Sequence, residues 1–289
     1  GWGTDEEPII KLVTSRTNAD RQQIIKFYKS SFGEDLVEEL DSELGGDAKR
    51  VVIGLFKTYL DYDCSELRKA MKGGGTDEET LIEIIGSRTS EQLTAIKDRF
   101  KELYDKNLEE EVADETGGDL KRLLISLLQC NRSDTTEIDE DKLNKDLADL
   151  YEAGEGTWGT DESVFNKIFS LRSPAELRYI NREYFKACEK SLKEVVESEF
   201  SGDMKNLLVT VLHAILNPAD YFATRIRAAC KGMGTDDETL IRVMISRDEI
   251  DMKEIKAIYK ERYDMTLYEQ IKDECSGDYK NLLLGIARD

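Results

Sequence analysis

The apolar positions of this chain repeat one helical pattern four times. Counted from Thr4, Thr76, Thr160 and Thr235, apolar residues occupy the fifth, eighth and ninth following positions, which lie on one face of an α-helix. The twelfth position is arginine each time, a cation that suits the last turn of a helix. The apolar residues are Ile9, Leu12, Val13; Leu81, Ile84, Ile85; Phe165, Ile168, Phe169; Leu240, Val243, Met244; the arginines are Arg16, Arg88, Arg172, Arg247.

Capping patterns predict more helices in each copy. Each of the four threonines is an expected N-cap, and another expected N-cap follows each arginine. A third helix is expected 31 residues after each threonine, and a glycine turn then leads into a fourth, nearly continuously apolar helix. The partners of the first caps are Glu7, Glu79, Ser163, Glu238; the second caps with their partners are Thr17 with Asp20, Thr89 with Gln92, Ser173 with Glu176, Asp248 with Asp251; the third caps are Asp35, Asn107, Ser191, Thr266; the fourth helices open at Asp47, Asp119, Asp203, Asp278.

These elements predict an all-α fold built from four repeats. A further helical stretch precedes the pattern in repeats two to four, so each unit has five helices. The first copy starts without that stretch, so its first helix and the residues upstream of it are expected to be missing here. The threonine spacings of 72, 84 and 75 residues place a polar linker around 131–141. The predicted repeats span residues 1–60, 61–131, 132–216 (with the linker) and 217–289.

Composition restricts the setting and the partners. A net charge of −20 opposes direct attraction to nucleic acid or to anionic lipid, so contact with phosphate needs a cation as mediator. Five cysteines without a Cys-x-x-Cys spacing favour a reduced, cytoplasmic setting over a disulfide framework. The sequence has neither an apolar run long enough to span a bilayer nor a signal-peptide pattern, and export by another route stays open.

A short signature surrounds each threonine. It reads Gly-x-Gly-Thr-Asp, with Thr157 in place of the first glycine in repeat three, and a glutamate follows each threonine by 39 residues. A phosphate cradle is disfavoured because the chain lacks the Lys-Ser/Thr pair and the strand of a P-loop. A simple turn explains the glycines but not the glutamate. The glutamates are Glu43, Glu115, Glu199 and Glu274.

A calcium site explains both parts of the signature. Glycines let several backbone carbonyls converge, and a bidentate carboxylate closes the cage. Three carbonyls and one such carboxylate supply about five oxygens, short of the six to eight that calcium takes. An external phosphate can fill the open positions. The sequence therefore predicts calcium-bridged attachment to anionic membranes, which reconciles an acidic protein with an acidic surface.

The residues around the loops fit a membrane contact. Both tryptophans, Trp2 and Trp158, and Met233 occupy the x position of the signature, where insertion at the headgroup level competes with packing against the protein itself. Basic residues beside two of the loops can pair with lipid phosphate or remain a solvated helix face. These are Lys72, Lys231, Arg68 and Arg227.

The four repeats with Lys-Gly-x-Gly-Thr and an acidic residue some forty positions later resemble the annexin family over essentially the whole chain. The resemblance implies right-handed superhelical repeats in a curved disk and reversible, calcium-dependent binding to phosphatidylserine-rich membranes. It also implies the calcium ligands, with the first carbonyl donor of repeat one absent from this chain. They are Gly1, Gly3 and Glu43; Met71, Gly73, Gly75 and Glu115; Gly154, Thr157, Gly159 and Glu199; Cys230, Gly232, Gly234 and Glu274.

The resemblance implies two further groups of residues. Minor calcium sites would use the acidic residue two after each threonine, and charged residues would line a polar central passage. That passage fits ion conduction. The preferred interpretation is that its residues form buried ion pairs that hold the two halves of the protein in register. The minor-site residues are Glu6, Glu78, Glu162 and Asp237, and the passage residues are Asp63, Glu66, Glu83, Arg88 and Arg242.

Other functions have less support in the sequence. The single histidine, His213, lies in an apolar helical stretch and has no nucleophile pattern around it, so the chain is not expected to be an enzyme. A helical-repeat scaffold for protein partners is the alternative, with partners bound through the segment that precedes the core. Self-association on membranes stays open.

Overall fold

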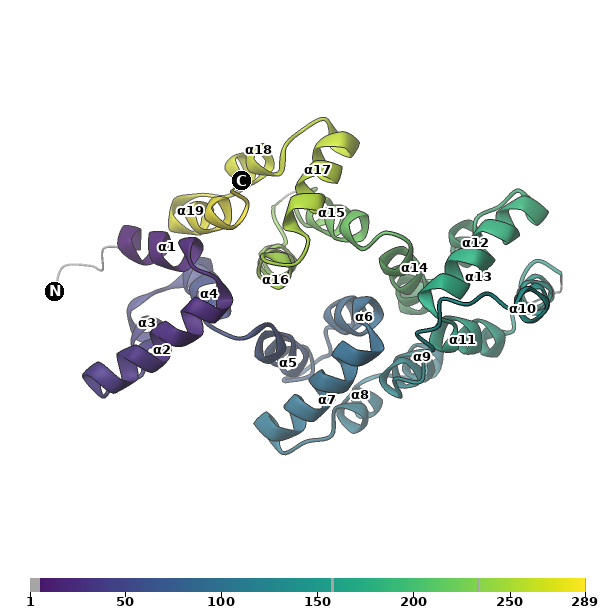
Figure 1. Cartoon of the computed structure of the whole chain (residues 1–289), viewed down its shortest axis with the longest axis horizontal. Coiled ribbons are helices and arrows are strands. Elements are labelled where there is room, and N and C mark those ends of the chain that lie inside the picture. The colour runs from purple at the N-terminus through teal and green to yellow at the C-terminus, as the bar shows by residue number, and fades with distance from the viewer. Residues whose placement is uncertain (1–5, 157–158, 233, 289) are drawn as a thin grey trace. The chain divides into compact units, whose positions relative to one another are not determined.

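The computed structural model describes residues 6–156, 159–232 and 234–288, which form nineteen helices and no strand (Figure 1). Contacts divide the chain into two compact units. Unit 1 comprises Gly1–Asp63 and Ala219–Asp289, and unit 2 comprises Cys64–Pro218. Unit 1 thus joins the first and fourth repeats, and unit 2 joins the second and third. The predicted all-α class is confirmed.

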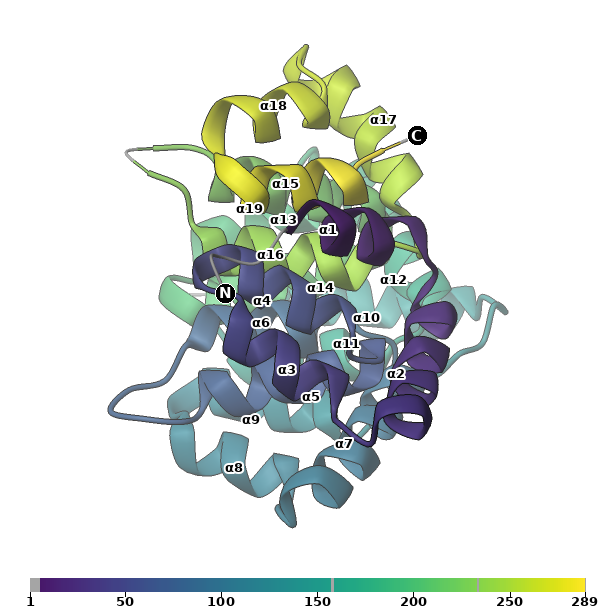
Figure 2. The same cartoon turned by 90° about the vertical axis from the view of Figure 1, so that its left-hand side faces the viewer.

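Unit 1 is held together by reciprocal helix packing. Helix α1 packs against α19, and α4 packs against both α16 and α19 (Figure 2). The helices of this unit are α1 (Glu6–Ser15), α2 (Asn18–Phe32), α3 (Leu36–Glu43), α4 (Gly46–Leu55), α15 (Pro218–Ala229, starting one residue before the unit), α16 (Asp237–Arg247), α17 (Met252–Tyr263), α18 (Leu267–Glu274) and α19 (Gly277–Ile286).

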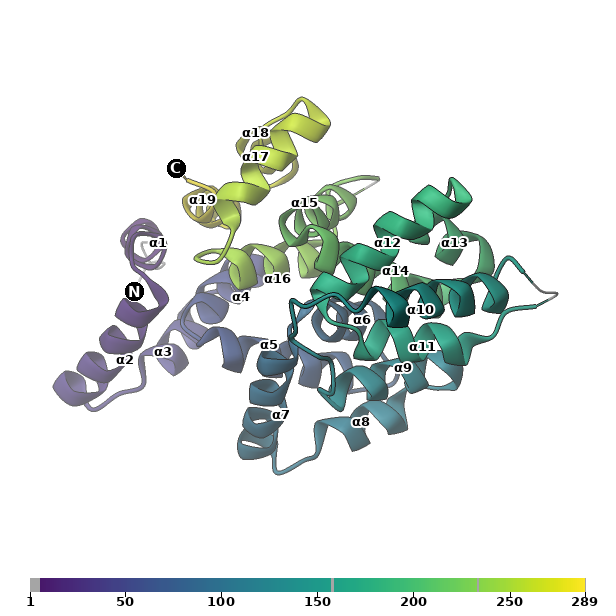
Figure 3. The same ribbon diagram turned by 45° about the vertical axis from the view of Figure 1, so that its right-hand side comes forward.

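Unit 2 repeats this arrangement. Helix α6 packs against α14, and α11 packs against α9 (Figure 3). Helix α14 buries Leu207, Leu208, Val211 and Leu212, as the apolar run predicts. The helices are α5 (Tyr59–Ala70, entering from unit 1), α6 (Glu78–Ser87), α7 (Ser90–Tyr104), α8 (Leu108–Glu115), α9 (Gly118–Leu128), α10 (Glu140–Ala153), α11 (Glu162–Leu171), α12 (Pro174–Cys188), α13 (Leu192–Glu199) and α14 (Gly202–Leu216).

Small residues allow these helices to cross closely. A Cβ at Gly86 of α6 would lie 2.8 Å from Cγ2 of Thr210 on α14, and a Cβ at Gly285 of α19 would lie 2.5 Å from Cγ2 of Thr14 on α1. Distances this short leave no room for a methyl group. The glycine at each crossing therefore sets how near the two helices come.

We expect Gly285→Ala to destabilise unit 1 by about 1–3 kcal/mol, because the new methyl group would overlap the stiff, β-branched Thr14 side chain. Chemical denaturation of the calcium-free chain measures this. Gly74→Ala is the control, since nothing lies within 4 Å of its Cβ position. Equal stability of the two variants would contradict the close crossing.

Most predicted caps are present. Thr17, Thr89 and Ser173 each form the expected reciprocal capping box before α2, α7 and α12, and Pro174 opens α12. The third helices begin at their predicted caps as well, with Asp35, Asn107, Ser191 and Thr266 accepting backbone hydrogen bonds.

Four predicted caps are wrong. The signature threonines of repeats two to four are not N-caps, because Asp77, Asp161 and Asp236 accept those hydrogen bonds one residue later. In repeat four the second cap also fails. Asp248 instead pairs with the buried Arg21 at 3.4 Å, and α17 begins only at Met252. Burial raises the pKa of Asp248, an effect that Arg21 partly offsets.

The predicted linker is tied to repeat three. Arg132 donates hydrogen bonds to the backbone oxygens of Phe169 and Arg172, and the Ser133 amide donates to Leu171 O at 3.1 Å. These oxygens end α11, where a cation is favourable. Burial lowers the pKa of Arg132 to about 10.

In the described part of the chain no helix is long and apolar enough to cross a bilayer.

Candidate functional site

The signature loops of repeats two, three and four are closed in the same way. In each, the backbone amide of the aspartate that caps the next helix donates to the last alanine of the preceding helix. The bonds are Asp77 N to Ala70 O at 2.9 Å, Asp161 N to Ala153 O at 2.7 Å, and Asp236 N to Ala229 O at 2.8 Å. The repeat-three loop is one residue longer, in line with its variant sequence. The closure leaves the loop glycines 73–75, 159, 232 and 234 exposed.

The distant glutamate lies beside each of these loops. Thr76 Oγ1 donates to Glu115 Oε2 at 2.8 Å, Thr160 Oγ1 donates to Glu199 Oε2 at 2.9 Å, and Thr235 Oγ1 donates to Glu274 Oε2 at 3.3 Å. These hydroxyls are available because aspartate, not threonine, caps the helix. The 39-residue spacing therefore corresponds to a direct contact between loop and carboxylate in three repeats.

Backbone conformation explains the first glycine of the loop. Gly73 has φ +128° and Gly232 has φ +134°, a region that residues with a side chain rarely adopt. The chain reverses sharply here, just after Met71 and Cys230, the first predicted carbonyl donors. Thr157, the equivalent residue of repeat three, lies outside the described residues.

In repeat three, Gly154 replaces the first donor and is buried against the glutamate. A Cβ at Gly154 would lie 3.4 Å from Cγ of Glu199. The next residue anchors the loop, because Glu155 pairs with Lys190 and accepts a hydrogen bond from Tyr184 OH at 3.1 Å. These contacts, Lys190 foremost, hold the pKa of Glu155 below its usual value.

In repeat four, the donor offered by Cys230 is its backbone carbonyl. Burial raises the pKa of the Cys230 thiol to about 12, so the thiol stays protonated at neutral pH in the metal-free chain. Cys275, next to Glu274, is buried as well, and burial raises its pKa to about 11.

The available donors suit a hard cation. Among the described residues no group of three or more histidine, cysteine, aspartate or glutamate side chains could hold a metal. Each predicted ligand set instead combines backbone oxygens with one carboxylate. Such an oxygen-only set fits calcium and does not fit zinc or copper.

Repeat one is described only in part. Glu43 is exposed at the end of α3, whereas the predicted ligands Gly1 and Gly3 lie outside the described residues. A calcium site there stays a prediction.

The predicted minor-site residues Glu6, Glu78, Glu162 and Asp237 are all half-buried in the first turns of their helices. Asp237 is already engaged, since it accepts a hydrogen bond from Tyr279 OH at 2.9 Å. Burial and this bond raise the pKa of the Tyr279 hydroxyl far above its usual value. A minor cation at Asp237 would compete with Tyr279.

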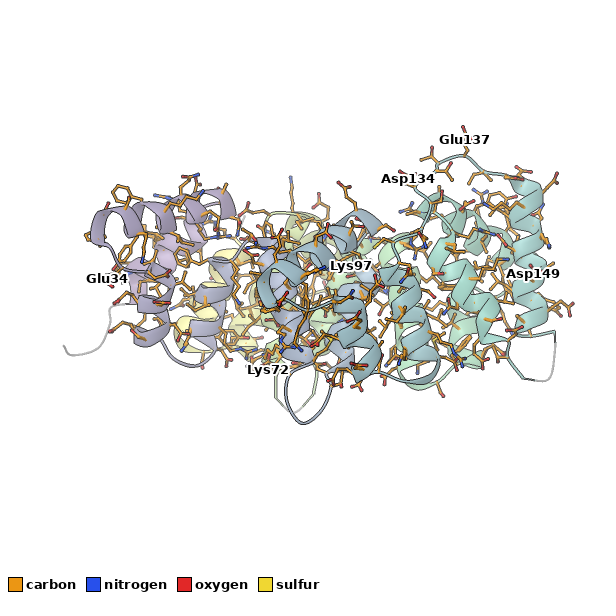
Figure 4. The ribbon with its side chains drawn as sticks, turned by 90° about the horizontal axis from the view of Figure 1, so that it is seen from below. Glu34, Lys72, Lys97, Asp134, Glu137 and Asp149 are labelled. Carbon is orange, nitrogen blue, oxygen red and sulfur yellow. The ribbon has the colours of Figure 1, made fainter. Side chains whose placement is uncertain are left out.

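The predicted membrane-contact residues divide into two groups. Lys72 and Lys231 are exposed, and Lys72 lies at the opposite face of unit 2 from Asp134 and Glu137 (Figure 4). Arg68 pairs with Glu111 at 2.6 Å, and Arg227 donates to Gln270, so both guanidinium groups are bound within their own unit. Contact of these arginines with lipid stays a prediction. Trp2, Trp158 and Met233 lie outside the described residues.

The charged residues assigned to a central passage belong to both units. In unit 1, Asp63 and Arg242 are buried; in unit 2, Glu83 and Arg88 are buried and Glu66 is half-buried. Arg242 donates to Thr239 Oγ1 at 3.2 Å. Their joint role stays a prediction.

The sequence analysis missed three residues that support the loops. Gln270 and Tyr279 contact the predicted ligands Glu274 and Asp237, and Lys190 anchors the repeat-three loop. Repeats two and three have neither a glutamine nor a tyrosine at the positions of Gln270 and Tyr279, so a search for shared positions overlooks these two. Lys190 has a counterpart in Lys106, but Lys106 pairs with Glu111 instead. Comparing the repeats for differences at one position would have found Gln270.

The chain is similar to known proteins in both sequence and fold. The Annexin family profile matches residues 1–55, 62–127, 146–211 and 221–286. Annexin A13 of Homo sapiens is 41% identical over 286 residues, 99% of this chain and 90% of that protein. A solved annexin A8 structure superposes with a TM-score of 0.97 at 42% identity, covering 100% of this chain and 91% of the other. Calcium-bound annexin (Sm)1 superposes with a TM-score of 0.87 at 31% identity, covering 100% and 86%.

The matched segments include each signature threonine and the glutamate 39 residues after it. They cover well over half of the chain, and the relatives match it over almost its full length. The chain belongs to the annexin family, membership of which implies calcium-dependent phospholipid binding in general.

Proposed function

We propose that this protein binds phosphatidylserine-rich membranes through calcium held by the loops of repeats two, three and four, without catalysing a reaction. The observation that carries the proposal is the contact of an exposed glycine loop with an exposed or half-exposed glutamate, made by a threonine hydroxyl in three repeats. The calcium-bound structure of the relative annexin (Sm)1 supports the choice of cation.

The ligand sets are those named above. The carbonyls of Met71, Gly73 and Gly75 would act with Glu115, and the equivalent carbonyls of repeat four with Glu274. Repeat three would use Gly154, Thr157 and Gly159 with Glu199. Calcium, when bound, supplies the positive charge that links these oxygens to a lipid phosphate.

The protein's own groups would prepare the contact. The threonine hydroxyl holds one carboxylate oxygen and leaves its remaining lone pair free. Lys72 and Lys231, both exposed beside their loops, would add direct attraction to phosphate. Because each site is weak alone, simultaneous use of several sites would give the affinity. The protein would then be peripheral to the membrane and present there only when calcium rises.

Cosedimentation with vesicles tests this function. We expect the chain to pellet with phosphatidylserine-containing vesicles in calcium and to return to the supernatant when a chelator is added. Phosphatidylcholine vesicles are the control for charge. Because lipid phosphate would fill the coordination positions that the loops leave open, added lipid should lower the calcium midpoint strongly. Binding that persists in chelator would refute the mechanism.

A further inference from the structure

Repeat four holds its predicted calcium ligand with an additional side chain. Gln270 is only 3% exposed and precedes Glu274 by four residues on α18, so both lie on the same helix face. The Gln270 Nε2 group donates to Glu274 Oε1 at 3.2 Å. A buried amide thus contacts an exposed carboxylate.

A neighbouring arginine fixes the orientation of the Gln270 amide. Arg227 Nη1 and Tyr259 OH both donate to Gln270 Oε1, the latter at 2.9 Å. A guanidinium has no acceptor, so the atom that faces Arg227 is the amide oxygen. The amide nitrogen must then face Glu274. The hydrogen bond from Arg227 therefore decides which amide atom faces Glu274.

Both oxygens of Glu274 are therefore held in the calcium-free protein. Thr235 donates to Oε2, and Gln270 donates to Oε1. Each carboxylate oxygen accepts two hydrogen bonds or ligands, so one lone pair on each remains for a cation. Groups that hold a ligand in this way commonly raise the affinity for the metal.

The other repeats lack this arrangement. The residue 35 positions after the threonine is Glu111 in repeat two and Val195 in repeat three. Glu111 accepts from Arg68 and Lys106, and as a carboxylate it offers Glu115 no donor. Val195 has no polar group. Among repeats two to four, only the fourth connects a half-buried arginine to the predicted calcium ligand through an intervening amide.

We propose that Gln270 is a positioning residue that raises the calcium affinity of repeat four, by presetting Glu274 for bidentate binding. This inference rests on the proposed function of the loops. Arg227 acts behind Gln270 by fixing the orientation of its amide, whereas Tyr259 only adds a second hydrogen bond to the same oxygen.

The test uses Gln270→Met in the full chain without lipid. Methyl-¹³C methionine NMR resolves the sites, because Met233 lies in the repeat-four loop and Met71 in the repeat-two loop, among only 6 methionines. We expect the calcium midpoint reported by Met233 to rise about tenfold. The midpoint reported by Met71 should not change.

Two matched variants separate the positioning of Glu274 by Gln270 from a general disturbance of the packing around the site. Glu111→Met removes the arginine partner at the same position of repeat two. It should leave the Met71 midpoint within about twofold, since Glu111 offers Glu115 no hydrogen-bond donor and its ion pairs with Arg68 and Lys106 are only partly buried. Tyr259→Phe removes only the second hydrogen bond to Gln270 Oε1. Because Arg227 still fixes the amide, this variant should leave the Met233 midpoint unchanged. A rise in Tyr259→Phe equal to that in Gln270→Met would overturn the assignment.

The outcomes also separate this inference from the proposed function. If the wild-type Met71 and Met233 signals respond to calcium but Gln270→Met has the wild-type midpoint, only the role of Gln270 fails. If neither signal responds in the wild-type chain, the proposed calcium loops fail, and the role of Gln270 with them.

Discussion

Replacing Glu115, Glu199 and Glu274 together by glutamine is expected to raise the calcium midpoint for binding phosphatidylserine vesicles by about a hundredfold. Each substitution removes the only carboxylate of its cage, and calcium affinity falls with ligand charge. Because several sites bind the same membrane at once, the losses of affinity at the individual sites multiply. Glutamine still accepts the hydrogen bond from threonine, so the loops should keep their structure.

The matched control replaces three exposed glutamates that lie outside the loops, Glu34, Glu137 and Glu261, and so changes the net charge equally. Its calcium midpoint should stay within about twofold of the wild type, since well-screened exposed charges contribute little. Circular dichroism checks that both triple variants are folded. If the two triple variants required the same calcium, the loop glutamates would not be the ligands.

Local signals predicted most helices of the fold. The boxes at Thr17, Thr89 and Ser173 need only residues three positions apart, so they could be recognised without tertiary information. Asp248 occupies the same position, yet a partner 227 residues away decides its role. At the position of Arg21, the other three repeats have a buried apolar residue: Leu93, Leu177 or Met252. An arginine at this otherwise apolar position was the one sign in the sequence that Arg21 needs an acidic partner.

The candidate site was predictable in part for the same reason. A fixed distance of 39 residues revealed that the loop and the glutamate belong together. Which group joins them was not predictable, because Thr76 and Asp77 are adjacent and both can cap a helix. Only the folded chain shows that aspartate caps the helix and threonine binds the glutamate. The pairing of repeats one with four and two with three also depends on tertiary packing.

Differences between repeats matter as much as their shared signature. Repeat three anchors its loop through Glu155 and Lys190, repeat four holds Glu274 through Gln270, and repeat two has neither contact. Loops with the same ligand types are thus supported by different residues. The three sites should therefore fill at different calcium concentrations, which would broaden the range over which the protein responds.

The largest effect on stability is expected from Asp146→Ala in unit 2. Asp146 on α10 accepts two hydrogen bonds from Arg172, from Nε at 2.5 Å and from Nη2 at 2.9 Å, and its side chain is only 4% exposed. The pair joins α10 to the end of α11. The hydrogen bonds to Asp146 raise the pKa of Arg172. The guanidinium stays charged even without this partner, because an arginine side chain is not deprotonated in proteins.

Removing one partner of a buried pair leaves an uncompensated charge, which costs about 3–5 kcal/mol. We expect Tm to fall by about 10 °C, measured by calorimetry in the absence of calcium. Asp149→Ala, on the same helix but half-buried, should cost under about 0.5 kcal/mol. The double variant Asp146→Leu with Arg172→Met should regain most of the loss, because apolar side chains of similar size can replace a buried ion pair. A double variant as unstable as Asp146→Ala would instead assign the loss to packing of α10 against α11.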